Sequence, residues 1–251
     1  METAFVKLIK ENTGIGRIIF FHPSSNAMPG FLLKKLGNTI IEADIDKDIK
    51  VIVLESEGRT FCAGASFDEL ISLNNMDEAI DFFMGFAKVI LAMKKSKKFV
   101  LTKVQGKAVG GGVGLIAASD FVMATDKAAV KLSELSIGIG PYVIAPAVKR
   151  KIGIAAFSEM SIDATRWFTA FWAREKGLFA RVWDNEQQLN EEMDLLANKL
   201  SGYDEQATAL LKAEIWKGTE NWDKLLYEQA QISASLLLRD YTKQKLNSFK
   251  K

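Results

Sequence analysis

Residues 104–112 read VQGKAVGGG, and this stretch is the most informative feature of the sequence for the fold and the site. It ends in Gly110, Gly111 and Gly112, which separate a predicted strand from a predicted helix of small residues. Consecutive glycines permit a very close backbone approach, positive φ angles, or both. A helix that begins at such a turn presents unpaired N–H groups and the positive end of its dipole. These groups can stabilise a negative charge that develops nearby.

A second turn of the same character lies upstream, where residues 61–66 read FCAGAS. Its side chains are mostly small, and it precedes a short helix predicted at 67–73. Two strand-to-helix turns of this kind can direct two N–H groups at one oxygen atom, which is how an oxyanion hole is built. A glycine run alone is not specific for such a hole, because many runs are tight turns or phosphate-binding loops. This one lacks the Lys and Ser/Thr of a P-loop and the spaced glycines of a dinucleotide-binding turn.

Glu134 is an acidic residue that the sequence places after a further predicted strand, next to Ser133. Most glutamates are solvated surface residues. The neighbouring Leu132 and Leu135 instead indicate a partly apolar environment, which would raise the pKa of this carboxyl group and make it a better proton carrier. We therefore predict a catalytic role for Glu134.

Strands and helices alternate in the first half of the chain and helices dominate the second, which predicts an α/β fold with a helical C-terminal part. Apolar and β-branched runs predict strands at residues 16–21, 51–54, 99–104, 121–125, 129–132 and 179–183. Helices are predicted at residues 31–44, 67–73, 77–95, 113–119, 141–151, 154–160, 165–176, 186–200, 206–217 and 222–249. A boundary near Ser201 and Gly202 divides a core of residues 1–200 from a helical region of residues 201–251.

The composition is that of an ordinary globular protein and argues against several classes. Hydrophobic residues make up 48% and charged residues 25% of the 251 residues, so the chain can form a substantial core. A net charge of +2, without a basic cluster interleaved with aromatic residues, argues against nucleic acid. No apolar run approaches the roughly 20 residues of a membrane helix, and the N-terminus has no signal-peptide layout. The lone cysteine, Cys62, indicates a reducing, cytoplasmic location, and the lone histidine, His22, disfavours a zinc site or a histidine triad.

Four stretches, taken in order, resemble the crotonase (enoyl-CoA hydratase/isomerase) family and span nearly the whole chain. Residues 59–65, RTFCAGA, resemble the first oxyanion turn of the family, and residues 104–112 resemble the second. Residues 133–138 resemble the segment that carries a catalytic carboxylate, and residues 164–182 resemble a helix followed by a Gly-Leu pair. The resemblance implies a spiral of repeated ββα units with a helical C-terminal trimerisation region. It also implies acyl-CoA substrates, no metal, no cofactor besides the CoA of the substrate, and assembly into a trimer or a dimer of trimers.

The resemblance also assigns roles to individual residues. The main-chain N–H groups of Ala65 and Gly111 would hold the thioester oxygen, and Glu134 would be the acid/base. The positions that it implies for substrate binding are Ala63, Gly64, Ser66, Phe67, Gly110, Gly112, Gly114, Ser133 and Tyr142. In this assignment the oxyanion residues act through their main chain, so the sequence shows only that their side chains are small.

Gly114 departs from the pattern of the family's hydratases, which usually have one glutamate at this position and a second at that of Glu134. One carboxylate can take a proton from one carbon and return it to another, so a double-bond shift is one expectation. Some relatives with glycine here look like hydratases of branched acyl-CoAs such as 3-methylglutaconyl-CoA, which keeps hydration at C2–C3 open. The remaining alternatives are another enolate reaction, such as decarboxylation or thioester hydrolysis, and a catalytically weak acyl-CoA binding protein.

Several other side chains have simpler structural interpretations. Asp120 is expected to be a structural carboxylate at a helix end, and Cys62 a small buried residue. The aromatic run at 167–172 covers more than one helical face and predicts a subunit interface. The aromatic stripe at 82–86 is interpreted either as pocket lining or as helix core, and the loop at 139–143 is a second lining candidate.

Overall fold

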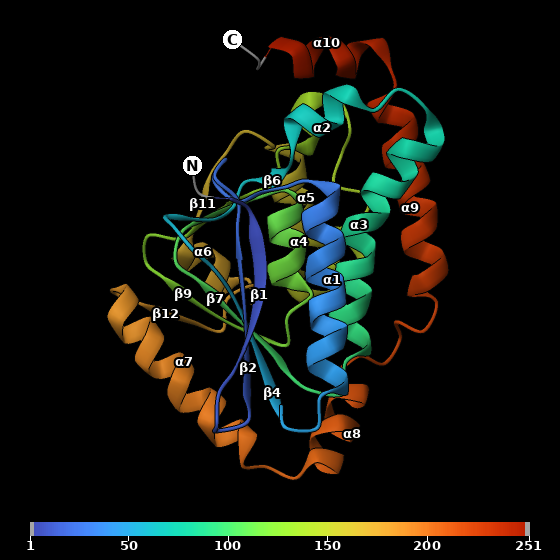
Figure 1. The fold of residues 1–251 in the computed structure, drawn as a ribbon. Coiled ribbons are helices and arrows are strands. Elements are labelled where there is room, and N and C mark those ends of the chain that lie inside the picture. Colours follow the sequence, from blue (N-terminus) through green and yellow to red (C-terminus); the bar gives the residue numbers. More distant parts are fainter. Residues whose placement is uncertain (1–2, 249–251) are drawn as a thin grey trace.

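Two main sheets organise the computed structural model of the protein, which describes residues 3–248 (Figure 1). The larger sheet has the strand order β1 (Phe5–Lys10), β2 (Ile15–Phe21), β4 (Val51–Ser56), β7 (Val100–Val104), β9 (Phe121–Thr125) and β12 (Arg181–Trp183). The β1–β2 pair is antiparallel, and the other neighbours are parallel. The smaller sheet has the order β11 (Phe168–Thr169), β10 (Ala129–Lys131), β8 (Lys107–Val109) and β5 (Thr60–Cys62). A two-stranded pair is formed by β3 (Ala27–Met28) and β6 (Gly64–Ala65).

Successive turns of the chain contribute one strand to each main sheet and then a helix. β4 enters the larger sheet and β5 the smaller one before α2 (Phe67–Ser72) and α3 (Met76–Lys95). β7 and β8 repeat this step before α4 (Gly111–Ala117). β9 and β10 repeat it before the 3-10 turn η1 (Glu134–Ile137) and α5 (Ala145–Ile162). The predicted spiral of ββα units is therefore confirmed.

Helices cover both faces of the larger sheet, as expected for parallel strands. All six residues of β4 are buried. Ile52 joins the main core with α1 (Gly30–Ile45) and α3, whereas its neighbour Val51 joins a second cluster with α7 (Glu186–Ser201). This alternation follows from the two-residue period of a strand. Figure 1 shows α1 and α3 side by side, with α7 apart from them beside the larger sheet.

The C-terminal helices add to the same core. After α8 (Glu205–Ile215), α9 (Trp222–Leu237) lies alongside α3 (Figure 1). Leu226 and Ala230 of α9 are four residues apart, are fully buried and belong to the main hydrophobic core. α10 (Asp240–Ser248) packs against α2 and η1. The predicted division into a core and a helical region stays a prediction. No helix between residues 3 and 248 is both long and apolar enough to cross a lipid bilayer.

Some elements differ from the sequence-based prediction. The helix predicted over 222–249 is divided into α9 and α10, and residue 249 lies outside the described part of the chain. No glycine or proline marks the break, so the pattern did not reveal it. The edge strand β1 was not predicted, because Val6 is its one buried residue. α6 (Ala170–Glu175) is shorter than the helix predicted over 165–176, because residues 168–169 pair with β10 as β11.

Candidate active site

Three loops meet where neighbouring parallel strands of the smaller sheet end. β5, β8 and β10 run in the same direction, and β8 lies in the centre. The turn at residues 63–65 follows β5, the glycine run follows β8, and Ser133 and Glu134 follow β10. Ligand sites form at the carboxyl ends of parallel strands, where such loops gather. The strand order places the glycine run between the first turn and Glu134.

The loops approach one another so closely that side chains would separate them. A Cβ atom at Gly110 would lie 2.8 Å from Oε1 of Glu134, and Gly110 has a φ of +51°. The N–H of Gly110 donates to the Lys131 carbonyl oxygen at 2.9 Å, which ties the glycine run to the strand that leads to Glu134. On the other side, Gly64 has a φ of +89°, and a Cβ atom there would lie 2.9 Å from the main-chain carbonyl oxygen of Val109, just before the glycine run. Glycine is therefore required for the close approach and for the positive φ.

Two main-chain N–H groups at this junction are not engaged by the adjoining helix or strand. Gly111 is the first residue of α4, so its N–H has no acceptor within that helix. The N–H of Ser66 donates to the Met28 carbonyl oxygen of β3 at 3.2 Å. Because successive N–H groups of an extended chain point in opposite directions, the N–H of Ala65 points away from β3. Ala65 and Gly111 line the same cavity, so their amides can be offered to one oxygen atom.

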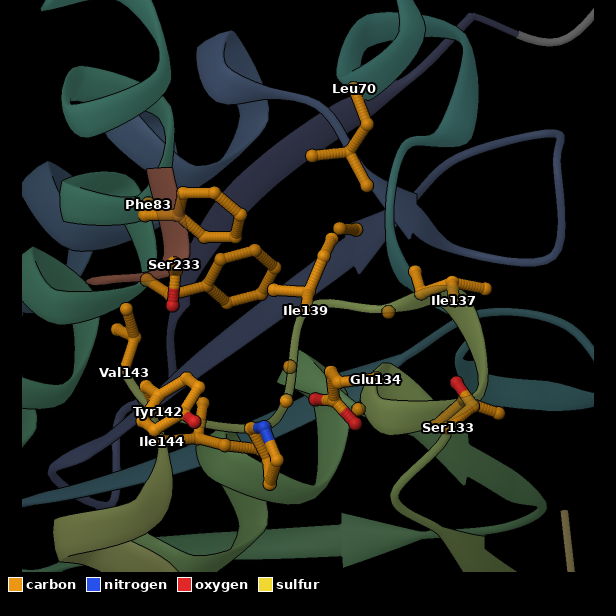
Figure 2. Close-up of a pocket in the computed structure, with 18 of the residues that line it drawn as sticks. Leu70, Phe83, Ser133, Glu134, Ile137, Ile139, Tyr142, Val143, Ile144 and Ser233 are labelled. Atoms are coloured by element: carbon orange, nitrogen blue, oxygen red, sulfur yellow. The ribbon is translucent and has the colours of Figure 1, made fainter. Parts of the chain in front are cut away.

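The cavity has a volume of about 60 Å³, and residues of all three loops line it. Figure 2 shows Ser133 and Glu134 together at one end of the wall, with Phe83 and Ser233 farther away. This volume is several times the roughly 10–15 Å³ that admits a water molecule, so the cavity has room for a small group of several atoms. The rest of the wall is mainly apolar and includes Leu70 of α2, Phe83 and Phe86 of α3, and Val143 and Ile144 before α5. Within residues 3–248, Glu134 is the one carboxylate of the lining, and no Lys, Arg or His contributes to it.

Glu134 presents an unpaired carboxyl oxygen at this site. The residue as a whole is partly exposed, but its Oε2 is buried and has no hydrogen-bond partner in the described part of the chain. Desolvation by burial raises the pKa of Glu134 to about 7, against a smaller opposing effect from its own main-chain N–H. A carboxyl group with a pKa near neutrality can both accept and donate a proton at physiological pH.

Most of the residues predicted for the site line the cavity. They are Ala63, Gly64, Ala65, Phe67, Gly110, Gly111, Ser133, Glu134 and Tyr142. Tyr142 is 37% exposed, and its hydroxyl group does not pair with Glu134 Oε2, which has no partner. Three loops that are far apart in the sequence therefore meet at one cavity, and the roles of these residues stay predictions.

Ser66, Gly112 and Gly114 lie outside the lining and have structural positions instead. The Ser66 hydroxyl caps α2 by accepting a main-chain N–H of its first turn at 3.4 Å. A Cβ atom at Gly112 would lie 2.7 Å from the Cβ of Cys62, and one at Gly114 would lie 2.3 Å from Cγ2 of Ile144. Position 114, where the resemblance implies the first glutamate of the hydratases, is therefore closed off by Ile144, the residue that precedes α5.

Some lining residues had no recognisable signal in the sequence. Ser233 of α9 is 1% exposed and lines the cavity, as does Leu70 of α2. Ser233 reaches the cavity because α9 packs against α3, and no local pattern predicts that contact. Both interpretations of the stripe at 82–86 hold, because Phe83 and Phe86 line the cavity and also belong to the main core.

Asp120, Cys62 and His22 have structural surroundings, and none of them lines the cavity. Asp120 forms an ion pair with the buried Lys212 at 2.9 Å. Burial raises the pKa of the Cys62 thiol to about 12, so it carries no thiolate at neutral pH. His22 Nδ1 accepts a main-chain N–H two residues further on at 3.2 Å. Within residues 3–248, no group of three or more His, Cys, Asp or Glu side chains is arranged to hold a metal ion.

Comparison with known families adds an independent observation to this geometry. The model of the family described as Enoyl-CoA hydratase/isomerase matches residues 10–250. The chain belongs to this family. The spiral of ββα units is thus that of a crotonase.

Relatives of this crotonase share its fold but differ in their reactions. The crystal structure of enoyl-CoA hydratase from Bacillus halodurans aligns with a TM-score of 0.90, covering 97% of this chain and 99% of that one at 22% identity. Enoyl-CoA hydratase domain-containing protein 3, mitochondrial, of Homo sapiens is 29% identical over 239 residues, which are 90% of this chain and 75% of that protein. Ethylmalonyl-CoA decarboxylase of Gallus gallus is 27% identical over 138 residues, which are 54% of this chain and 46% of that protein. At such identities, membership of the family leaves the particular reaction open.

Proposed function

We propose that this crotonase is an isomerase that converts a 3-enoyl-CoA thioester into the 2-enoyl-CoA thioester. Glu134 would be the proton carrier. The observation that supports the proposal is that Glu134 is the one carboxylate that residues 3–248 contribute to the cavity. A double-bond shift needs one group that takes a proton and returns it. Hydration of the kind usual in the family uses two glutamates.

The proposed reaction begins when the ionised Glu134 takes a proton from C2 of a 3-enoyl thioester. The electrons of the broken C–H bond are delocalised into the thioester, and the resulting dienolate oxygen accepts hydrogen bonds from the N–H groups of Ala65 and Gly111. The same carboxyl group then returns the proton to C4, which leaves the double bond between C2 and C3. No water, metal ion or further reactant is consumed.

The packing around Gly114 favours this reaction over hydration. Hydration adds water at C3 and requires a group that positions the water. Ile144 occupies the space in which a second glutamate would begin at position 114. The other polar side chains of the lining carry hydroxyl groups, which are far weaker bases than a carboxylate.

Turnover of 3-hexenoyl-CoA tests the proposal. We expect the wild-type protein to form 2-hexenoyl-CoA, followed by the ultraviolet absorbance of the conjugated thioester. Glu134→Gln keeps the size of the side chain but removes the proton carrier, so kcat is expected to fall by about 10²- to 10⁴-fold. Glu228→Gln, which changes an exposed carboxylate on α9, is the matched control and should retain full activity.

Other products would replace the proposal with one of its alternatives. Formation of 3-hydroxyacyl-CoA without isomerisation would indicate a hydratase, and release of free CoA would indicate a thioesterase. Loss of CO₂ from an alkylmalonyl-CoA would indicate a decarboxylase. Tight binding of acyl-CoA without any of these reactions would indicate a binding protein.

We also propose a trimer or a dimer of trimers that requires no metal and no cofactor besides the CoA of the substrate. Trp167 and Phe171 are 38% and 58% exposed and remain candidates for a subunit contact, whereas Phe168 is buried within the chain. Mass measurement by light scattering, compared with the chain mass of 27.8 kDa, tests the assembly. A cytoplasmic location stays a prediction.

A further inference from the structure

Ser233 brings a hydroxyl group into an otherwise apolar part of the cavity. It lies on α9, is 1% exposed, and shares the wall with Phe83 and Val143. Figure 2 shows its oxygen directed toward the side of the cavity where Tyr142 and Val143 lie. The Ser233 hydroxyl group therefore faces a different part of the cavity from Glu134, the proton-transfer group, and it comes from a distant part of the sequence.

The hydroxyl group of Ser233 makes no hydrogen bond to the rest of residues 3–248, although a helical serine commonly bonds to the preceding turn. Ser161 of α5 donates to the Phe157 carbonyl oxygen at 2.7 Å, and Ser235 of α9 donates to the Ile232 carbonyl oxygen at 2.8 Å. The Ser233 oxygen is also not among the polar atoms sealed inside the protein without a partner. The hydroxyl group is therefore open to the cavity, and a group that displaces water from there leaves it without a hydrogen bond unless that group supplies one. Its partner is thus expected to be a group that occupies the cavity.

The charge of the wall limits what that group can be. Within the described residues no Lys, Arg or His lines the cavity, and Glu134 is an acid itself. A carboxylate at the far end of an acyl group would be desolvated without a counter-charge, which is strongly unfavourable. A neutral oxygen loses much less hydration and can exchange a hydrogen bond with the Ser233 hydroxyl group.

We propose that Ser233 is a specificity-determining residue that selects short acyl groups with a neutral oxygen, a hydroxyl or ketone, near their far end. Such groups are preferred over plain alkyl groups and over dicarboxylic acyl groups. The inference rests on the proposed function in one respect, because it places the thioester at the oxyanion turns and the acyl group in the cavity. Ser233 takes no part in proton transfer.

Binding of saturated acyl-CoA esters tests this selectivity, because these esters have no double bond to isomerise. Calorimetry would compare pentanoyl-CoA with 4-oxopentanoyl-, 5-hydroxypentanoyl- and glutaryl-CoA, which have similar length. We expect at least one of the two neutral oxygenated esters to bind about 3- to 10-fold more tightly than pentanoyl-CoA, the net effect of one hydrogen bond. Glutaryl-CoA is expected to bind more weakly than all three.

Two variants of α9 complete the experiment. Ser233→Ala should abolish the preference for the oxygenated ester, whereas Ser235→Ala, an exposed serine on the same helix, should keep it. Survival of the preference in Ser233→Ala, absence of a preference in the wild type, or tightest binding of glutaryl-CoA would overturn the inference. A preference that depends on Ser233 but is accompanied by no isomerisation would support the inference and remove the proposed reaction.

Discussion

Glu134 links the stability of the fold to pH through its buried carboxyl group. Burial raises its pKa to about 7 from an ordinary value of 4.5. Between these two pH values the native state holds more protons than the unfolded state, so the free energy of unfolding falls as the pH rises. The contribution of Glu134 to the free energy of unfolding is thus largest when its carboxyl group is protonated, and this contribution is lost as the pH rises through about 7. At ~1.36 kcal/mol per pKa unit, this loss is on the order of 3 kcal/mol.

Glu134→Gln should remove this dependence while leaving the other titrating groups unchanged. Urea denaturation at pH 4.5 and at pH 8 should show a smaller loss of stability in the variant than in the wild type, by on the order of 3 kcal/mol. Glu228→Gln alters an exposed side chain and should follow the wild type. Parallel pH curves for the wild type and Glu134→Gln would contradict a desolvated, unpaired carboxyl group.

The residues of the site differ in how far the sequence reveals them. Ala65 and Gly111 lie in turns of small residues. These residues predict the tight turn, and that turn predicts an exposed main-chain N–H group. Glu134 lies two residues after a predicted strand, between Leu132 and Leu135, and this position predicts a partly apolar environment. Ser233 has no such mark, because a helical serine faces a cavity only when a distant element, here α3, determines which side of α9 is buried.

At the scale of elements, α4 lies so close to Ile144, the N-cap of α5, that position 114 has no room for a side chain. A Cβ atom there would lie 2.7 Å from the branched Cβ of Ile144, which cannot move without its backbone. We expect Gly114→Ala to destabilise the protein by about 1–3 kcal/mol through overpacking, although alanine is the better helix former by ~1 kcal/mol. Denaturant unfolding provides the measurement.

A double-mutant cycle isolates this contact. Ile144→Ala should cost stability by itself, but Gly114→Ala should cost much less in that background, because the space has been vacated. Strictly additive effects would contradict the packing. For the same reason, Gly114→Glu alone would report on packing between the two helices rather than on the capacity for hydration.

α8 is attached to the larger sheet by a buried ion pair. Asp120 Oδ2 lies 2.9 Å from Lys212 Nζ, and the two side chains are 4% and 2% exposed. Asp120 also accepts a hydrogen bond from Trp216 Nε1 at 2.7 Å. Asp120→Asn leaves the Lys212 charge buried without its counter-charge, so we expect a loss of about 3–5 kcal/mol.

Thermal and denaturant unfolding measure this effect. Lys212→Met, added to Asp120→Asn, should restore part of the stability, because it removes the uncompensated charge. Glu228→Gln breaks an exposed pair with Lys224 and should change stability by less than about 1 kcal/mol. An Asp120→Asn variant as stable as that control would show that the pair is not buried in solution.

Helices with capping or charged residues at their ends were predicted well. Helix ends that depend on contacts with distant parts of the chain were not. α3 begins after its cap Asn75, has Asp77 in its first turn and ends at Lys95, so local chemistry marks both ends. The break between α9 and α10 has no such mark. It lets α10 pack against η1, where Thr242 donates to the Gly138 carbonyl oxygen at 3.4 Å, and that contact joins distant parts of the chain.

Across the whole molecule, α9 connects the active site with the main core. Ser233 lines the cavity, while Leu226, two turns earlier on the same helix, is fully buried in the main hydrophobic cluster. α3 has the same two functions, because Phe83 and Phe86 belong to the core and to the cavity wall. The cavity therefore depends on contact between two helices that are more than a hundred residues apart in the sequence.

If α9 and the spiral form one cooperative unit, a defect in α9 must weaken amide protection in both. Leu226→Ala creates a cavity at a fully buried position and should cost about 2–5 kcal/mol. Hydrogen exchange should then show the same loss of protection in α3 as in α9, because both open in the same unfolding reaction. Leu210→Ala, at a position on α8 that is 64% exposed, is the matched control and should change stability by less than about 0.5 kcal/mol. Loss of protection confined to residues beyond 200 would instead make the C-terminal helices a separately folding region, and the cavity wall would then open without unfolding of the spiral.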